Sequence, residues 1–350
     1  MTKVEAKRNS SIELLRIIAM IGVIIIHYVT GGGGALNYVA DNSLNKYYLI
    51  FSKSFSICAV NLFIMISAYF LSCTQKRKLS KVSELIFQVI VFRALFYGIN
   101  IKLGATFSFS DMISSILPAN YFVILYAVLY IISPYINILI QSISKEQLKK
   151  LVITLFIVFS IYNSFIDFFG SPTGLSTVGI GGSQAGYTIV NFVLVYTIGA
   201  YIRISELEIS RKQSLSGIII CVFIIFLQAL FENAFLGGDP TAWNYNHPAV
   251  VIMPVFVILL FNSFSFESKA INELAKATFT CFLFHGFFMS RIMVEKFVNG
   301  NIFILIMHQL GSAIALYLAS YFVYKLYAFI TKPLFKWISP KIDRLGKYIY

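Results

Sequence analysis

An arginine and a histidine stand within the first apolar stretch of this sequence, where a lipid-facing helix needs neither. The stretch contains Glu13, Arg16 and His27 among mostly aliphatic residues. If it is an α-helix, the step from Arg16 to His27 closes three turns to within about 20°, so both side chains share a face and lie about 16 Å apart along the axis. Glu13 joins that face, one turn before Arg16.

These residue types support two interpretations. In the functional one, they line a tunnel with Arg16 toward the cytoplasm and His27 toward the outside. A neutral imidazole can take a proton from a hydroxyl or carry an acyl group, and a guanidinium can bind phosphate or stabilise negative charge. In the structural one, Glu13 and Arg16 form a buried ion pair, and His27 is hydrogen-bonded to a neighbouring helix.

Further candidates lie in later apolar runs and in one loop. A charge near the bilayer centre costs a few kcal/mol or more, so it needs a partner or a wet cavity. Snorkelling to the headgroups explains Arg16 and Arg291 but not Arg93, which lies near mid-helix. His285 either lines the same cavity or makes a structural hydrogen bond. Trp243 lies in a loop with His247, where the alternatives are a sugar contact and a solvated loop.

The elements that must position these residues are transmembrane helices. The chain has 350 residues, 58% hydrophobic and only 12% charged, whereas soluble proteins are about 25% charged. A span needs roughly 20 apolar residues, and ten candidates predict one all-α, polytopic membrane bundle. They are Ile12–Thr30, Phe55–Ser72, Val82–Ile101, Asn120–Gln141, Leu151–Phe169, Thr188–Ile204, Leu215–Phe235, Ala249–Phe264, Ala277–Phe297 and Ile302–Ile330.

The net charge of +13 is explained by orientation and not by nucleic-acid binding. Of the 28 Lys and Arg residues, 21 fall in alternate connections and in the termini, four on the opposite side and three inside apolar runs. The positive-inside rule then predicts that both termini are cytoplasmic, as an even number of spans requires. Residues 1–332 form one transmembrane domain and 333–350 a basic cytoplasmic tail. No metal-binding spacing is present.

Several motifs together resemble a known family. Ser11-Ile-Glu-Leu-Leu-Arg16 with His27 ten residues further on resembles the first helix of the bacterial membrane acyltransferase-3 family. The resemblance continues in order through residues 58–67, 126–137, 196–201 and 271–285, which match family helices two, four, six and nine. Ala68 stands where the family usually has Gly. The resemblance covers roughly residues 10 to 330. Because no hydrolase-like domain follows the last helix, the chain resembles the stand-alone form of the family.

The resemblance implies an O-acetyltransferase of the bacterial cytoplasmic membrane. It would move an acetyl group from cytoplasmic acetyl-CoA to a sugar hydroxyl of a surface polysaccharide or its lipid-linked precursor, with no metal. The implied partners are the glycan acceptor and the lipid bilayer, while the oligomeric state stays open. The implied catalytic residues are His27, Arg16 and Glu13.

The expected binding residues are less closely matched to the family. The paired-Arg form of its CoA motif is absent here, Arg93 lies deeper than the family's usual Arg, and the positive-inside rule explains the same lysines without a ligand. A multi-pass transporter of a glycan-related or small anionic solute, and a non-catalytic membrane partner, stay open as alternatives. The expected CoA contacts are Lys76, Arg77, Lys78, Lys81 and Arg93, and the expected substrate contacts are Ser67, Tyr126, His285, Arg291 and Trp243.

Overall fold

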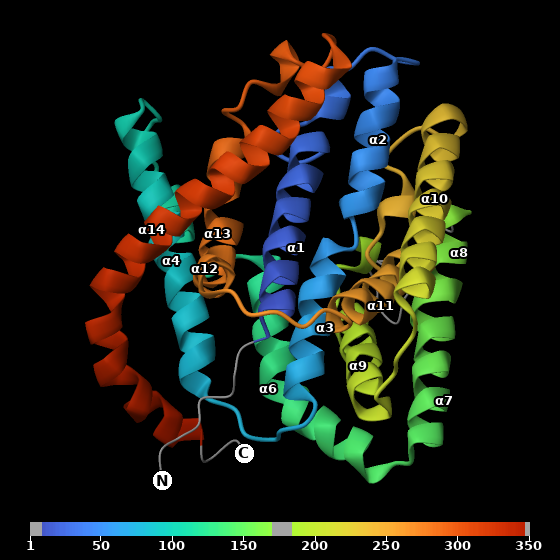
Figure 1. The fold of residues 1–350 in the computed structure, drawn as a ribbon. Coiled ribbons are helices and arrows are strands. Elements are labelled where there is room, and N and C mark those ends of the chain that lie inside the picture. Colours follow the sequence, from blue (N-terminus) through green and yellow to red (C-terminus); the bar gives the residue numbers. More distant parts are fainter. Residues whose placement is uncertain (1–8, 170–183, 347–350) are drawn as a thin grey trace.

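The computed structural model describes residues 9–169 and 184–346, and every regular element in these ranges is a helix (Figure 1). Eight helical segments there are long and apolar enough to cross a membrane, so the chain is a multi-pass membrane protein. They are α1 (Ser10–Val29), α2 (Leu44–Ser56) with α3 (Ala59–Leu71), α4 (Leu79–Lys102), α6 (Tyr121–Ser142), α7 (Lys145–Phe156) with α8 (Tyr162–Phe168), α10 (Arg211–Phe235), Thr241–Asn262 with α11 (Pro248–Asn262), and α14 (Ile302–Leu345).

The other two predicted spans correspond to shorter helices, α9 (Ile189–Ser205) and α13 (Thr278–Met289). The prediction that the second of these continues to Phe297 was wrong. The chain leaves the helix after Met289, and Met293 then adopts a left-handed backbone with φ of 51°. The apolar residues Ile292, Val294 and Phe297 continue the apolar run in the sequence. They pack against the hydrophobic core from a 3-10 turn and not from the α-helix.

The second predicted span began too late. The helix begins at Leu44, where the Ser43 side chain accepts a hydrogen bond from the backbone of Lys46, and it reaches Leu71 with a break near Cys58. Its polar residues looked like loop residues in the sequence. Asn45, for example, is buried, and its amide donates to two backbone carbonyls of the 298–300 turn. Such tertiary contacts satisfy the polar side chains that made this part of the helix resemble a loop in the sequence.

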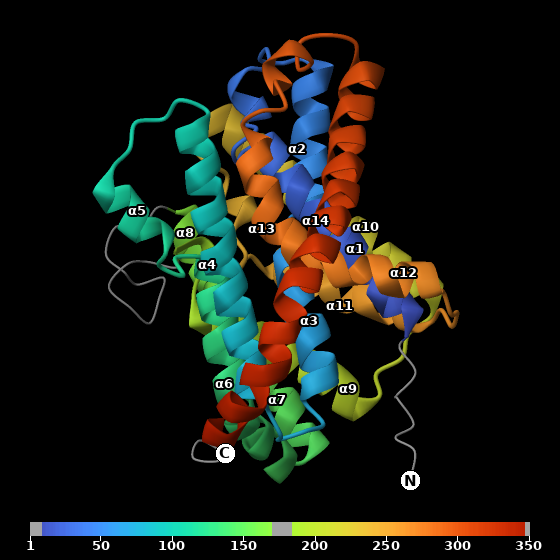
Figure 2. The same ribbon diagram turned by 90° about the vertical axis from the view of Figure 1, so that its left-hand side faces the viewer.

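Several connections fall at two ends of the bundle, whereas residues 263–268 cross its middle (Figure 1). Residues 72–78, 143–144 and 206–210 lie at one end with the last turns of α14, while residues 31–43 and 290–301 lie at the other (Figure 1). The helix α14 packs first on α13 and then on α4 (Figure 2). Its 44 residues make about 66 Å of helix, twice the hydrocarbon thickness of about 30 Å. The predicted domain boundary at residue 332 lies inside this helix.

The first helix is the centre of the bundle. It packs against α2, α3, α11, α13 and α14, and most of its residues are buried. Its first turn is fixed by Ser10, whose hydroxyl donates to Asn272 and accepts from the backbone of Ser268. These contacts join α1 to α12 (Lys269–Leu274), which leads through a 3-10 turn into α13.

Two of the family-like motifs hold helices together. A Cβ on Gly199 of α9 would lie 2.7 Å from Cβ of Ala68 on α3, so these small residues let the two backbones approach closely. Asn137 of α6 donates to the carbonyls of Leu71 and Thr74 and accepts from the hydroxyl of Tyr196. These bonds fix α3, α6 and α9 around the site described next.

Candidate functional site

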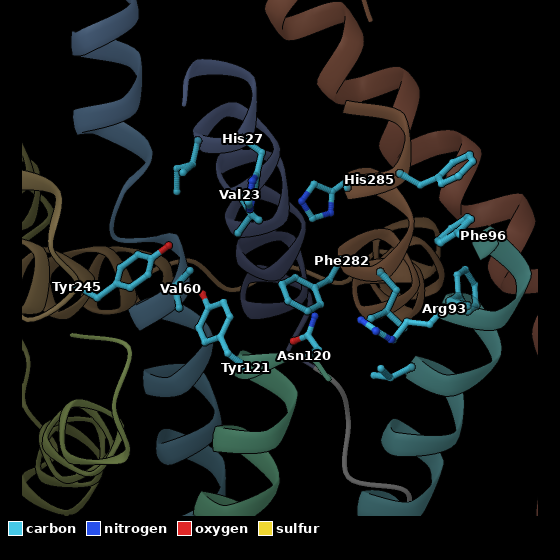
Figure 3. Close-up of a pocket in the computed structure, with 16 residues that line it drawn as sticks. Val23, His27, Val60, Arg93, Phe96, Asn120, Tyr121, Tyr245, Phe282 and His285 are labelled. Atoms are coloured by element: carbon cyan, nitrogen blue, oxygen red, sulfur yellow. The ribbon is translucent and has the colours of Figure 1, made fainter. Parts of the chain in front are cut away.

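A cavity of about 370 Å³ lies beside the end of α1 that carries His27, and we call it the outer cavity. Its wall is formed by α1, α3, α4, α13, the start of α6 and the segment that precedes α11. Two histidines, four Phe and Tyr rings and one arginine of this wall are labelled in Figure 3. The labelled lining residues are Val23, His27, Val60, Arg93, Phe96, Asn120, Tyr121, Tyr245, Phe282 and His285.

His27 and His285 form a pair at this cavity. Their ring centroids are 5.0 Å apart with an angle of 56° between the planes, and Figure 3 shows the rings side by side. They come from α1 and α13, 258 residues apart in the chain. The prediction that His285 shares a cavity with His27 is therefore consistent with the geometry.

The hydrogen bonding of His285 defines its tautomer. Nδ1 lies 3.0 Å from the carbonyl oxygen of Cys281, which can only accept, so Nδ1 carries the proton when the ring is neutral. Nε2 is then a lone-pair acceptor, and it is buried without a hydrogen-bond partner among the residues that the structure describes. A buried acceptor without a partner is costly unless a ligand or water satisfies it. The ring thus offers a hydrogen-bond acceptor next to His27.

A run of four glycines, Gly31 to Gly34, follows α1 and packs against His27. Gly33 donates its backbone N–H to the carbonyl of His27, 3.0 Å away. A Cβ on Gly31 would overlap Nδ1 of the His27 ring and lie 2.9 Å from its Cα. A residue larger than glycine at position 31 would therefore push the imidazole out of its place. The run Gly31 to Gly34 therefore supports the His27 side chain from the backbone.

An inner cavity of about 350 Å³ lies beside the other half of α1. Arg16 and Glu13 line it, and Nη1 of Arg16 is 3.3 Å from a carboxylate oxygen of Glu13. Ser67 and Tyr126 also line it, and their hydroxyl groups lie 3.2 Å apart. The ion pair expected from the structural interpretation is thus present, but it faces a cavity, so the two interpretations are compatible.

The two cavities meet at three side chains. Val23, Val60 and Phe282 line both the inner and the outer cavity and therefore stand between them. Val23 lies on the same face of α1 as Arg16 and His27, seven residues after the first and four before the second. The structure thus has two cavities along this face of α1, and we call the three apolar side chains at their boundary the constriction.

Arg93 lines the outer cavity and not the inner one. Its Nη1 donates to the carbonyl of Ala119 and its Nη2 to that of Ser114. These bonds fix the segment between α5 (Phe109–Ser115) and α6, including Asn120 and Tyr121 of the cavity wall. Its position is thus on the His27 side of the constriction, away from the other residues predicted to contact CoA.

The basic loop before α4 divides into one buried and three exposed side chains. Arg77 is buried; its Nε donates to Ser133, and its other nitrogens donate to the carbonyls of Leu71, Thr74 and Lys76. These bonds cap the end of α3 and occupy the donors that would hold a phosphate. The exposed members of the loop are Lys76, Lys78 and Lys81.

Two predicted substrate contacts do not line either cavity. Trp243 is buried, donating to the Ser54 hydroxyl, and the Lys53 ammonium lies 3.7 Å from its ring centroid. Arg291 is exposed, where its guanidinium stacks on Phe287 and donates to Asn100 of α4. Both hold neighbouring segments of the protein in place.

Several residues that line the two cavities were not predicted from the sequence. Asn120 and Tyr121 begin α6, Tyr245 precedes α11, and Lys276 and Thr278 lie at the start of α13. A polar or aromatic residue at a helix end resembles a cap or an interfacial anchor, so the sequence carried no distinguishing signal. Among the described residues, no three His, Cys, Asp or Glu side chains are grouped as a metal site.

Comparison with known proteins gives one match. Residues 9–325 match a protein-family model described as an acyltransferase domain, the acyltransferase 3 family model. The match spans both cavities and every helix that lines them. No curated protein and no solved structure matches the chain.

Proposed function

Because the chain belongs to the acyltransferase 3 family, and is therefore a membrane acyltransferase, we propose that it moves an acetyl group from cytoplasmic acetyl-CoA to a sugar hydroxyl of a surface polysaccharide or its lipid-linked precursor. We propose the bacterial cytoplasmic membrane as its location. The proposed topology has ten crossings with both termini in the cytoplasm, since 21 of the 28 Lys and Arg residues fall in alternate connections and in the termini.

The arrangement of the two cavities is the observation that best supports this proposal. Arg16 faces one, His27 faces the other, and among the described residues three apolar side chains line both cavities and separate them. Lys276 lines the same cavity as Arg16 and belongs to a basic connection, and we therefore assign the inner cavity to the cytoplasmic side. A donor from the cytoplasm and an acceptor from outside can therefore approach one another without either crossing the membrane.

The donor occupies the cytoplasmic side of this arrangement. We assign the CoA phosphates to the exposed Lys76, Lys78 and Lys81, because the donors of Arg77 are already used within the protein. The pantetheine arm then extends into the inner cavity, where Ser67 and Tyr126 offer hydroxyl groups. The thioester passes Arg16 and points its acyl end at the constriction.

The transfer needs a base and a group that stabilises charge. His27 accepts the proton of the sugar hydroxyl while the hydroxyl oxygen forms a bond to the thioester carbonyl carbon. The negative charge that develops on the donor faces Arg16. The C–S bond then breaks, and the imidazolium returns its proton to the departing CoA sulfur. His285 Nε2 accepts a hydrogen bond from the acceptor, which orients the sugar against His27.

A sided assay tests the proposed function. We expect labelled acetyl groups to appear on glycan when acetyl-CoA is added to inside-out membrane vesicles, and not when it is added to intact right-side-out vesicles. The measurement is radioactivity in the extracted glycan and free thiol from released CoA. Vesicles without the protein are the control. Release of no CoA with either orientation would contradict the proposal and favour a transporter.

Gly31→Ala is expected to lower kcat about 100-fold, because the new Cβ displaces the His27 ring and misplacement by about 1 Å costs this much. The matched control is Gly32→Ala, whose Cβ meets Met289 at 3.3 Å and not His27. Acetyl transfer and thermal melting are measured for both variants. Equal activity of the two alanine variants would show that Gly31 does not position the imidazole.

A further inference from the structure

Three helices bring one bulky side chain each to the level between the two cavities. On α1, Val23 lies about 6 Å along the axis from His27 and about 10 Å from Arg16. On α3, Val60 lies two turns before Ser67, and on α13, Phe282 lies one turn before His285. The inner cavity thus lies on one side of these three residues, and the outer cavity lies on the other side.

The constriction is held rigidly. A Cβ on Gly22 of α1 would lie 3.2 Å from Cβ of Ala59 on α3, so the two backbones are close beside Val23 and Val60. Both valines are buried, and a β-branched side chain has little rotamer freedom in a helix. The ring of Phe282 packs against Phe122 with 5.3 Å between centroids. Widening the passage would require separation of packed helices.

We propose that Val23, Val60 and Phe282 select the acyl group by length and restrict transfer to the acetyl group. This inference rests on the proposed function. The thioester arrives on the Arg16 side while the proton acceptor lies on the His27 side, so the acyl end of the donor enters the constriction first. Acetyl presents one methyl group there. Each further methylene must fit among three apolar side chains that cannot move apart.

The test compares acyl donors of increasing length in variants that widen the passage. Val60→Ala and Phe282→Leu are purified in detergent and assayed with acetyl-, propionyl- and butyryl-CoA, using CoA release in the presence of glycan acceptor. We expect the butyryl-to-acetyl ratio of kcat/KM to rise at least about tenfold in each variant, since one methylene in a pocket is worth about 10- to 200-fold in discrimination.

Two valines provide matched controls. Val123 lines only the inner cavity and Val89 only the outer one, and both are buried like Val60. Val123→Ala and Val89→Ala remove the same atoms, and we expect their butyryl-to-acetyl ratios to stay within about twofold of the wild-type ratio, whatever their acetyl rates. Elution volume and thermal melting identify a variant that fails to fold, in which case the other constriction variant decides the result.

The outcomes separate this inference from the function on which it rests. Unchanged ratios in folded constriction variants would overturn the length selection, as would an equal rise in the two controls. In either case, acetyl transfer by the wild-type protein would leave the proposed function intact. A wild-type protein that consumes none of the three donors would instead refute the proposed function itself.

Discussion

Replacement of His27 by alanine is expected to lower kcat for acetyl transfer by about 10²- to 10⁴-fold, the contribution of one general base. His27 faces the outer cavity, four residues after Val23 of the constriction, where it would meet the hydroxyl of a sugar bound in that cavity. His285 lies 5.0 Å away on α13, where the carbonyl of Cys281 holds its Nδ1, so we expect that it does not replace the lost base. The measurement is the rate of labelled acetyl incorporation at saturating donor.

A second histidine variant controls for loss of an imidazole from the same region. His308 stacks on Phe297, and its Nδ1 is 2.8 Å from the hydroxyl of Tyr28 on α1, outside both cavities. We expect His308→Ala to keep transfer within a few-fold of wild type. If His27→Ala retained wild-type kcat while remaining folded, the imidazole could not be the proton acceptor.

Replacement of Arg16 by alanine is expected to lower kcat about 10²- to 10³-fold, as removal of one oxyanion-stabilising donor does in other acyl transfers. The guanidinium faces the inner cavity and is oriented by Glu13, so it is in place before the charge develops on the donor. Arg16→Lys should recover part of the rate, because it restores the charge without the planar fork. Steady-state kinetics with acetyl-CoA separate kcat from KM.

The control for Arg16 is Arg203, an arginine outside the two cavities. Arg203 of α9 is exposed and stacks on Tyr69, with 5.1 Å to the ring centroid, and it does not line either cavity. Arg203→Ala is expected to leave kcat unchanged. A loss in Arg16→Ala that fell wholly on KM would argue against transition-state stabilisation and for simple donor binding.

The sequence by itself determined that the chain is helical and crosses a membrane repeatedly, because apolar runs of spanning length depend only on local composition. It also determined that Arg16 and His27 share a face of α1, since helical periodicity is a local property. The glycine run was visible, but its purpose was not. Only the fold shows that Gly31 packs against the imidazole.

The tertiary structure decided which polar residues meet. Arg77 looked like a phosphate ligand and instead caps α3, while Arg93 looked like its companion and lies on the far side of the constriction. The pairing of His27 with His285 joins helices 258 residues apart, which no local pattern can encode. The constriction is apolar throughout, so its three residues are indistinguishable in sequence from lipid-facing ones. Contacts between distant helices, and not composition, turn one face of α1 into two cavities.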